Sequence, residues 1–156
     1  MARCTWDGYA YYTGELRAIT TQYSKVLMLG DSMGGSAALM FSPLASRVVS
    51  FVPQVELLGY SQATREDLTA ERCRAFQTRL LQSVADTAAT VTVHIGADEE
   101  DSRHAGMLST GETGRVQIVV HPECPDHHLS GRLKTAGRLV EIVRSELKAM
   151  GVARMY

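Results

Sequence analysis

The amino-acid sequence predicts an α/β fold with three layers, in which helices cover both faces of a mostly parallel sheet of about four strands. Short apolar runs alternate with longer helical patterns, as is typical of right-handed βαβ units. The first run, residues 26–29, is wholly apolar, as expected for a strand buried on both faces of a parallel sheet. The chain has 156 residues and no linker or internal repeat, so a single domain over residues 1–156 is predicted.

Four strands are expected, and each is followed within two residues by a glycine or a proline, which stops it. They span residues 26–29, 48–52, 91–95 and 116–120. The first helix, residues 8–23, precedes them. Its apolar side chains are spaced four, three and four residues apart and define one face, comprising Tyr12, Leu16, Ile19 and Tyr23.

Further helices are expected between the strands and after them. A helix over residues 33–41 ends before Pro43. A long helix runs from Thr64 to about Val84, with Asp67 in the position of a capping box, and residues 99–109 form a loop and a short helix. The last helix, residues 129–150, has the clearest period in the chain and ends at a C-capping Gly151. Its apolar stripe consists of Leu129, Leu133, Ala136, Val140, Val143, Leu147 and Met150.

Composition excludes several classes of function. The formal net charge of -1 and the absence of a basic stripe argue against nucleic acid or an anionic membrane as a partner. No apolar run is long enough to cross a bilayer, and the N-terminus has no signal-peptide core, so a cytoplasmic or other intracellular location is expected. No cofactor is expected, because no binding fingerprint is present. A metal site is not expected either, because the five histidines show no H-x-x-x-H or H-E-x-x-H spacing.

The motif with the most chemical meaning is Gly30-Asp31-Ser32-Met33-Gly34, which lies between the first strand and the next helix. The two glycines let the chain turn sharply, so that the Ser32 hydroxyl is held out on a strained turn. The helix that begins there directs backbone N–H groups and its positive dipole end at an anion formed beside this serine. Strand, G-x-S-x-G and helix in this order predict a serine nucleophile.

Candidate acids and bases follow two later strands. Parallel sheets place their chemistry at the carboxyl ends of the strands. The loop after the third strand holds four acidic residues, which are Asp98, Glu99, Glu100 and Asp101. The loop after the fourth strand holds His127 and His128. We favour His127 as the base, because it lies just before the first turn of the last helix and is free to reach back over the sheet; His128 is the alternative. Of the remaining histidines, His94 is expected to pack in a strand, His104 to lie on a helix surface and His121 to cap a strand end.

The order of serine, acid and histidine, together with the motif Gly30-Asp31-Ser32-Met33-Gly34-Gly35, resembles the α/β-hydrolase superfamily. The resemblance spans residues 8–150 and matches the second half of that fold. It implies a Ser32, His127 and Asp101 triad, with Asp98 as the competing acid, and the backbone N–H of Met33 as one oxyanion donor. The loop that supplies the family's second donor has no counterpart here. The implied function is a serine hydrolase that cleaves a small-molecule carboxylic ester or thioester through an acyl-enzyme; an acyltransferase with the same residues differs only in its acceptor.

Two other functions compete. Gly30-Asp31-Ser32 also resembles the G-D-S block of SGNH/GDSL esterases, and Asp101 and His104 have the D-x-x-H spacing of that family, but its asparagine motif is missing. The other is a catalytically weak or inactive α/β-hydrolase fragment that serves as a binding or assembly module.

The first strand, Val26 to Leu29, is predicted to be an apolar edge without its usual neighbour. Such edges pair with other chains. A homodimer through this edge is therefore expected, or else cover from the first helix, with Trp6, Tyr9, Tyr12 and Leu16 against the edge.

Overall fold

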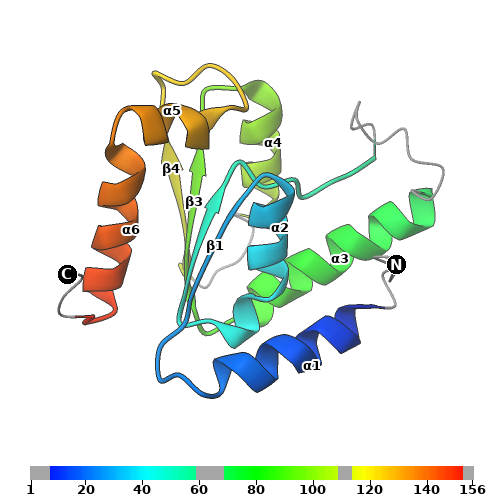
Figure 1. Cartoon of the computed structure of the whole chain (residues 1–156). Helices are drawn as coiled ribbons and strands as arrows, with labels where there is room; N and C mark the ends of the chain where they lie inside the picture. Colours follow the sequence, from blue (N-terminus) through cyan, green and yellow to red (C-terminus); the bar gives the residue numbers. More distant parts are fainter. Residues whose placement is uncertain (1–7, 59–68, 109–113, 153–156) are drawn as a thin grey trace.

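The computed structural model describes residues 8–58, 69–108 and 114–152. Its centre is a four-stranded sheet in which all neighbouring strands are parallel, in the order β1-β2-β3-β4 (Figure 1). The strands are β1 (Leu27–Asp31), β2 (Arg47–Phe51), β3 (Thr90–Ile95) and β4 (Val116–Val120). Each lies within one or two residues of its predicted position, so the predicted α/β fold class is confirmed.

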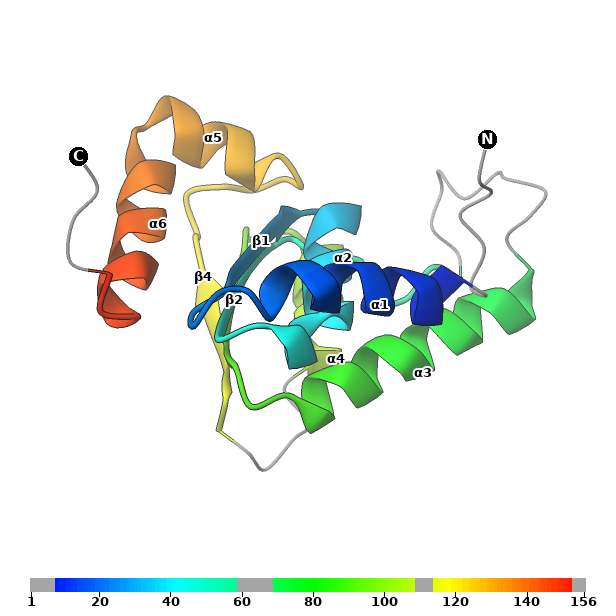
Figure 2. The same cartoon turned by 60° about the horizontal axis from the view of Figure 1, so that its bottom comes forward.

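Helices cover both faces of the sheet. They are α1 (Gly8–Thr20), α2 (Met33–Met40), α3 (Ala70–Asp86), α4 (Glu99–Leu108), α5 (Leu129–Thr135) and α6 (Arg138–Ala149), with the short 3₁₀ helix η1 (Ser42–Leu44) after α2. Helices α2, α3 and α4 lie on one side of the sheet, and α6 lies on the other (Figure 1). The view in Figure 2 shows the same separation from below, with α1 beside α3.

Two apolar clusters hold these layers together. The larger one lies between the sheet and α2, α3 and α4, with Leu39, Phe76 and Leu80 among its buried members. The smaller one lies between the sheet and helices α5 and α6, where Leu129 and Leu133 are buried. Burying such side chains contributes about 1.5–3 kcal/mol each, which fixes both helical layers on the sheet.

The predicted helix over residues 129–150 is two helices, and this prediction was wrong. Gly137 has φ 75°, a left-handed conformation that ends α5 before α6 begins. The break shifts the buried face, so that Leu139 and Ile142 pack on the smaller cluster while Val140 is 51% exposed. The predicted C-cap is confirmed: Gly151 (φ 72°) donates its N–H to the carbonyl of Lys148.

Helix α3 begins later than predicted. Thr69 has an extended backbone, and its side chain accepts a hydrogen bond from Arg72 N–H, so it is the N-cap of α3. Thr64 and Asp67, the predicted capping pair, lie outside the described residues.

Helix α1 packs through a different face from the predicted one. Tyr9 stacks on Phe41 with ring centroids 5.5 Å apart, and Arg79 lies over the same tyrosine ring. Ile19 and Tyr23, which belong to the predicted apolar face, are exposed. The helix therefore covers the α2–α3 side of the sheet.

Strand β1 is an outer strand, and among the described residues it pairs only with β2. Leu29 in this strand is 48% exposed. Trp6 lies outside the described residues, and the homodimer through this edge stays a prediction. In the part of the chain that the structure covers, none of the helices has the length and apolar character to cross a membrane.

Candidate active site

Ser32 lies on a sharp turn between β1 and α2. Its backbone has φ 52° and ψ -120°, an uncommon conformation for a residue with a side chain, and its N–H donates to the carbonyl of Phe51 at 2.9 Å. Two close approaches require glycine. A Cβ on Gly30 would lie 2.0 Å from the carbonyl oxygen of Gly34, and one on Gly35 would lie 2.6 Å from the Ser50 hydroxyl.

Gly34 itself differs from the sequence-based interpretation, since a Cβ there would meet open space. The turn therefore depends on glycine at positions 30 and 35.

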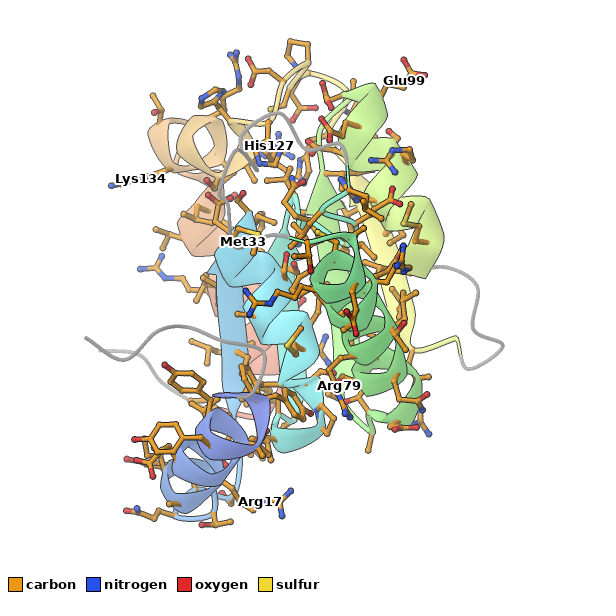
Figure 3. All side chains as sticks on the ribbon, turned by 90° about the vertical axis from the view of Figure 1, so that its right-hand side faces the viewer. Arg17, Met33, Arg79, Glu99, His127 and Lys134 are labelled. Carbon is orange, nitrogen blue, oxygen red and sulfur yellow. The ribbon has the colours of Figure 1, made fainter. Side chains whose placement is uncertain are left out.

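Three of the predicted site residues form a continuous chain of hydrogen bonds. His127 Nε2 lies 3.1 Å from Ser32 Oγ, and His127 Nδ1 lies 2.7 Å from Asp101 Oδ1. The carboxylate accepts the proton on Nδ1, which leaves the Nε2 lone pair free to accept the hydroxyl proton of Ser32. Figure 3 shows His127 between α4, marked by Glu99, and α5, marked by Lys134, at the same end of the sheet as Met33.

Asp101 lies in the first turn of α4 and is only 1% exposed. Burial raises the pKa of its carboxyl group, and the hydrogen bond with His127 opposes that effect. Its second oxygen, Oδ2, is buried and has no hydrogen-bond partner among the residues that the structure describes. The hydrogen bond with His127 therefore compensates for the burial of the Asp101 carboxylate.

Asp98, the competing acid, caps the start of α4. Asp98 Oδ1 accepts hydrogen bonds from the N–H groups of Glu100 (2.9 Å) and Asp101 (3.2 Å), as an N-capping side chain does. Glu99 and Glu100 are exposed. Asp98 therefore holds the start of the helix that carries Asp101.

The competing histidine is exposed to solvent and contacts Asp126. The side chain of His128 is 87% exposed, and its backbone N–H donates to Asp126 Oδ1 at 3.0 Å. Arg132 binds the same carboxylate, and this hydrogen bond lowers the pKa of Asp126 to about 2. Asp126 therefore ties the histidine loop to α5.

His94 is buried in β3, as predicted, and stacks on Phe51 with centroids 4.9 Å apart. His121 is also buried and forms a hydrogen bond with it, with His121 Nε2 3.0 Å from His94 Nδ1. Because Arg138 donates to His121 Nδ1, the proton of His121 is on Nε2, and His94 Nδ1 accepts it. The sequence predicted a strand cap at His121, and the structure shows a buried histidine pair.

The prediction for His104 was wrong, since this residue is fully buried rather than on a helix surface. Its Nδ1 accepts hydrogen bonds from the N–H groups of Val55 (3.2 Å) and Glu56 (3.3 Å). The burial was visible in the spacing, because Asp101, His104 and Leu108 recur at three and four residues along one face of α4.

Comparison with known proteins shows the fold. No family model and no curated protein matches the sequence. Among solved structures, the esterase domain of a Rhodothermus marinus protein matches with TM-score 0.53 and 15% identity, over 75% of this chain and 60% of that one. NosK from Streptomyces actuosus matches with TM-score 0.57 and 17% identity, over 96% of this chain and 80% of that one. The S-formylglutathione hydrolase FrmB from Staphylococcus aureus matches with TM-score 0.50 and 18% identity, over 83% of this chain and 59% of that one.

These proteins include α/β-hydrolases, and the chain has the α/β-hydrolase fold. It spans about 60% of the length of the esterase domain and of FrmB.

Proposed function

We propose that this protein is a serine hydrolase that cleaves a small-molecule carboxylic ester or thioester through an acyl-enzyme. The observation that carries the proposal is the unbroken chain of hydrogen bonds from Ser32 through His127 to Asp101. The same constellation of nucleophile, base and orienting acid recurs in serine hydrolases on unrelated folds.

In the proposed reaction, Ser32 Oγ attacks the carbonyl carbon and its proton passes to His127 Nε2. The tetrahedral intermediate then collapses, and the alcohol or thiol leaves with the proton from His127. A water molecule next gives a proton to His127 and attacks the acyl-enzyme, and the carboxylic acid departs as Ser32 regains its proton. Asp101 keeps the proton of the neutral imidazole on Nδ1 and stabilises the imidazolium.

The negative charge on the tetrahedral intermediate faces the start of α2. The first N–H groups of a helix have no acceptor within the helix, and Met33 is the first residue of α2. Its N–H is the proposed oxyanion donor, supported by the positive end of the helix dipole.

A fluorophosphonate probe tests the proposal, because its phosphorus reacts with an activated serine and releases fluoride. We expect one adduct on Ser32, and Ser32→Ala should lose both the adduct and esterase activity, by about a million-fold. The melting temperature should stay nearly unchanged. Ser145→Ala, at an exposed serine on α6, is the matched control. An unlabelled wild-type protein, or retention of most activity by Ser32→Ala, would contradict the assignment.

The partly exposed outer strand β1 favours a second function, that of a binding or assembly module with weak or no activity. The same probe separates the two, because such a module leaves it unreacted. The buried His104 argues against the SGNH/GDSL alternative, since its Nδ1 is occupied by two backbone N–H groups. Added acyl acceptors would distinguish an acyltransferase from a hydrolase.

A further inference from the structure

The segment that follows β2, residues 52–56, lies between the helix that begins at the nucleophile and the helix that carries the acid. It starts at Val52, whose φ of 40° is rare for a β-branched residue. The N–H of Val52 donates to the carbonyl of His94 at 2.8 Å, so the segment begins firmly attached to β3. Residues 52–55 are all buried.

The nucleophile helix holds this segment through Ser36. The Ser36 hydroxyl donates to the carbonyl of Gln54 at 2.7 Å and accepts the N–H of the same residue at 2.9 Å. Ser36 is fully buried and lies one helical turn after Ser32, whose carbonyl accepts the N–H of Ser36. Both backbone groups of Gln54 are therefore satisfied by the helix that starts at the nucleophile.

The acid helix holds the next two residues through His104. Its Nδ1 accepts the N–H groups of Val55 and Glu56, so the ring must be neutral, with its proton on Nε2. Arg103 reinforces the contact through an ion pair with Glu56. His104 lies one turn after Asp101, on the same buried face of α4.

The neutral state of this ring agrees with its surroundings. The charged groups that face it are Arg103, Glu100, Asp101 and Glu56. Burial lowers the pKa of His104, and the Arg103 charge acts in the same direction, whereas the three carboxylates oppose it.

We propose that residues 52–56 form a brace between the nucleophile and the acid, with Ser36 and His104 as the positioning residues that hold its two ends. The proposal rests on the proposed function, because positioning matters only if Ser32, His127 and Asp101 react together. Each positioning residue lies one turn from a triad residue, so a shift of the brace moves α2 relative to α4. A displacement of about 1 Å in a catalytic group can cost roughly 100-fold in rate.

Substitutions at His104 test this directly. In His104→Asn the amide oxygen takes nearly the place of Nδ1, whereas His104→Leu leaves the N–H groups of Val55 and Glu56 buried and unpaired. We expect His104→Leu to lower the second-order rate of fluorophosphonate labelling by roughly 10- to 100-fold. The midpoint of its pH profile should move to lower pH, because a displaced Asp101 stabilises the protonated imidazole less. His104→Asn should restore most of the rate and the midpoint, and Ser36→Ala should act in the same direction as His104→Leu.

Thr87→Ala is the matched control for lost stability. Thr87 is fully buried, and its hydroxyl donates to the carbonyl of Ser42 and accepts the N–H of Ala89, at the other end of the sheet. It should lower the free energy of unfolding without changing the labelling rate or its pH profile.

Hydrogen exchange at the amides of Val55 and Glu56 gives a readout that needs no activity. These amides should be protected in the wild type and in His104→Asn, and should exchange faster in His104→Leu. If these amides stay protected in His104→Leu, the proposal that His104 holds the brace is contradicted. If they lose protection while labelling and its pH profile match the wild type, the positioning role is wrong. Failure of the wild type to react with the probe would instead count against the proposed function, and the exchange data would still test the brace.

Discussion

The two central strands and the two outer strands of the sheet are built from similar apolar residues but are buried to very different extents. In β2 and β3, Val49 and Val91 are fully buried. In β1 and β4, Leu29 and Val120 are about half exposed, at 48% and 54%. Residue type alone does not set burial, because a strand also needs a neighbour on each side and a helix on each face.

Two of the three proposed catalytic groups nevertheless lie in the loops that follow the outer strands. Ser32 follows β1 and His127 follows β4, whereas Asp101 follows the central strand β3. Backbone hydrogen bonds tie the outer loops to the centre: Ser32 N–H donates to Phe51, and Ala97 N–H donates to Cys124 at 2.7 Å. The central strands therefore supply stability, and the site depends on how firmly the outer strands are tied to them.

After Ser32→Ala, the largest effect is expected from the acid, the one proposed catalytic group that follows a central strand. Asp101→Asn should lower the esterase rate by about 10⁴-fold, because an amide no longer keeps the proton of His127 on Nδ1. Asp98→Asn is the matched control, and it should change the rate little because asparagine also caps helices well. Steady-state kinetics on both variants measure this. A larger loss in Asp98→Asn than in Asp101→Asn would reverse the assignment of the acid.

The histidine pair links central β3 to the end of outer β4 and should make stability depend on pH. Burial, then the charges of His121 and Arg138, lower the pKa of His94 to about 4, from 6.5 in the unfolded chain. Below about pH 6.5 the unfolded state therefore binds the proton first, and the free energy of unfolding falls by about 3 kcal/mol by pH 4.

Urea unfolding at neutral and acidic pH measures this dependence. His94→Asn keeps an acceptor for His121 but cannot titrate, so its stability should change less with pH. A dependence as steep as that of the wild type would show that other groups cause the acid sensitivity. His104 and His121, whose pKa values are also lowered by burial, should account for what remains.

A matched pair of valines tests the comparison itself. Val49→Ala in central β2 should cost about 2 kcal/mol, from lost burial and the cavity left behind. Val120→Ala in outer β4 should change stability by no more than about 0.5 kcal/mol, since it is an exposed position. Chemical denaturation of both variants gives the two values. Equal losses would mean that outer and central strands contribute alike.

The smallest effect concerns self-association. If β1 pairs with a second copy, light scattering at high protein concentration should show a dimer. Leu29→Lys should shift it towards monomer, because a charged residue on an edge strand discourages pairing. A monodisperse wild-type monomer would contradict the predicted homodimer.

The strands, and the convergence of the three candidate site residues, were predictable from sequence for the same reason. Apolar runs stopped by glycine or proline define strand ends, and the ends of parallel strands meet at one edge, where Ser32, Asp101 and His127 come together. The spacing along α4 indicated the burial of His104, but its hydrogen-bond partners could not be predicted, because the N–H groups of Val55 and Glu56 are some fifty residues away and leave no local signal. The break at Gly137 was missed because the apolar period continues across it. A glycine inside such a pattern can either continue the helix or end it, depending on its neighbours.

The order of the strands in the sheet is also the order in which the ribosome makes them. Each strand after β1 can therefore add to a neighbour that has already been synthesised, without waiting for a later segment to be inserted between them. The proposed active site, in contrast, is completed late, because Ser32 and His127 are 95 residues apart. At about 5–20 residues per second, the 32 residues between the end of β3 at Ile95 and His127 take roughly 2–6 s to synthesise, so three of the four strands are available before the serine meets its base. A nascent chain would thus form most of its sheet before the proposed nucleophile could meet its base.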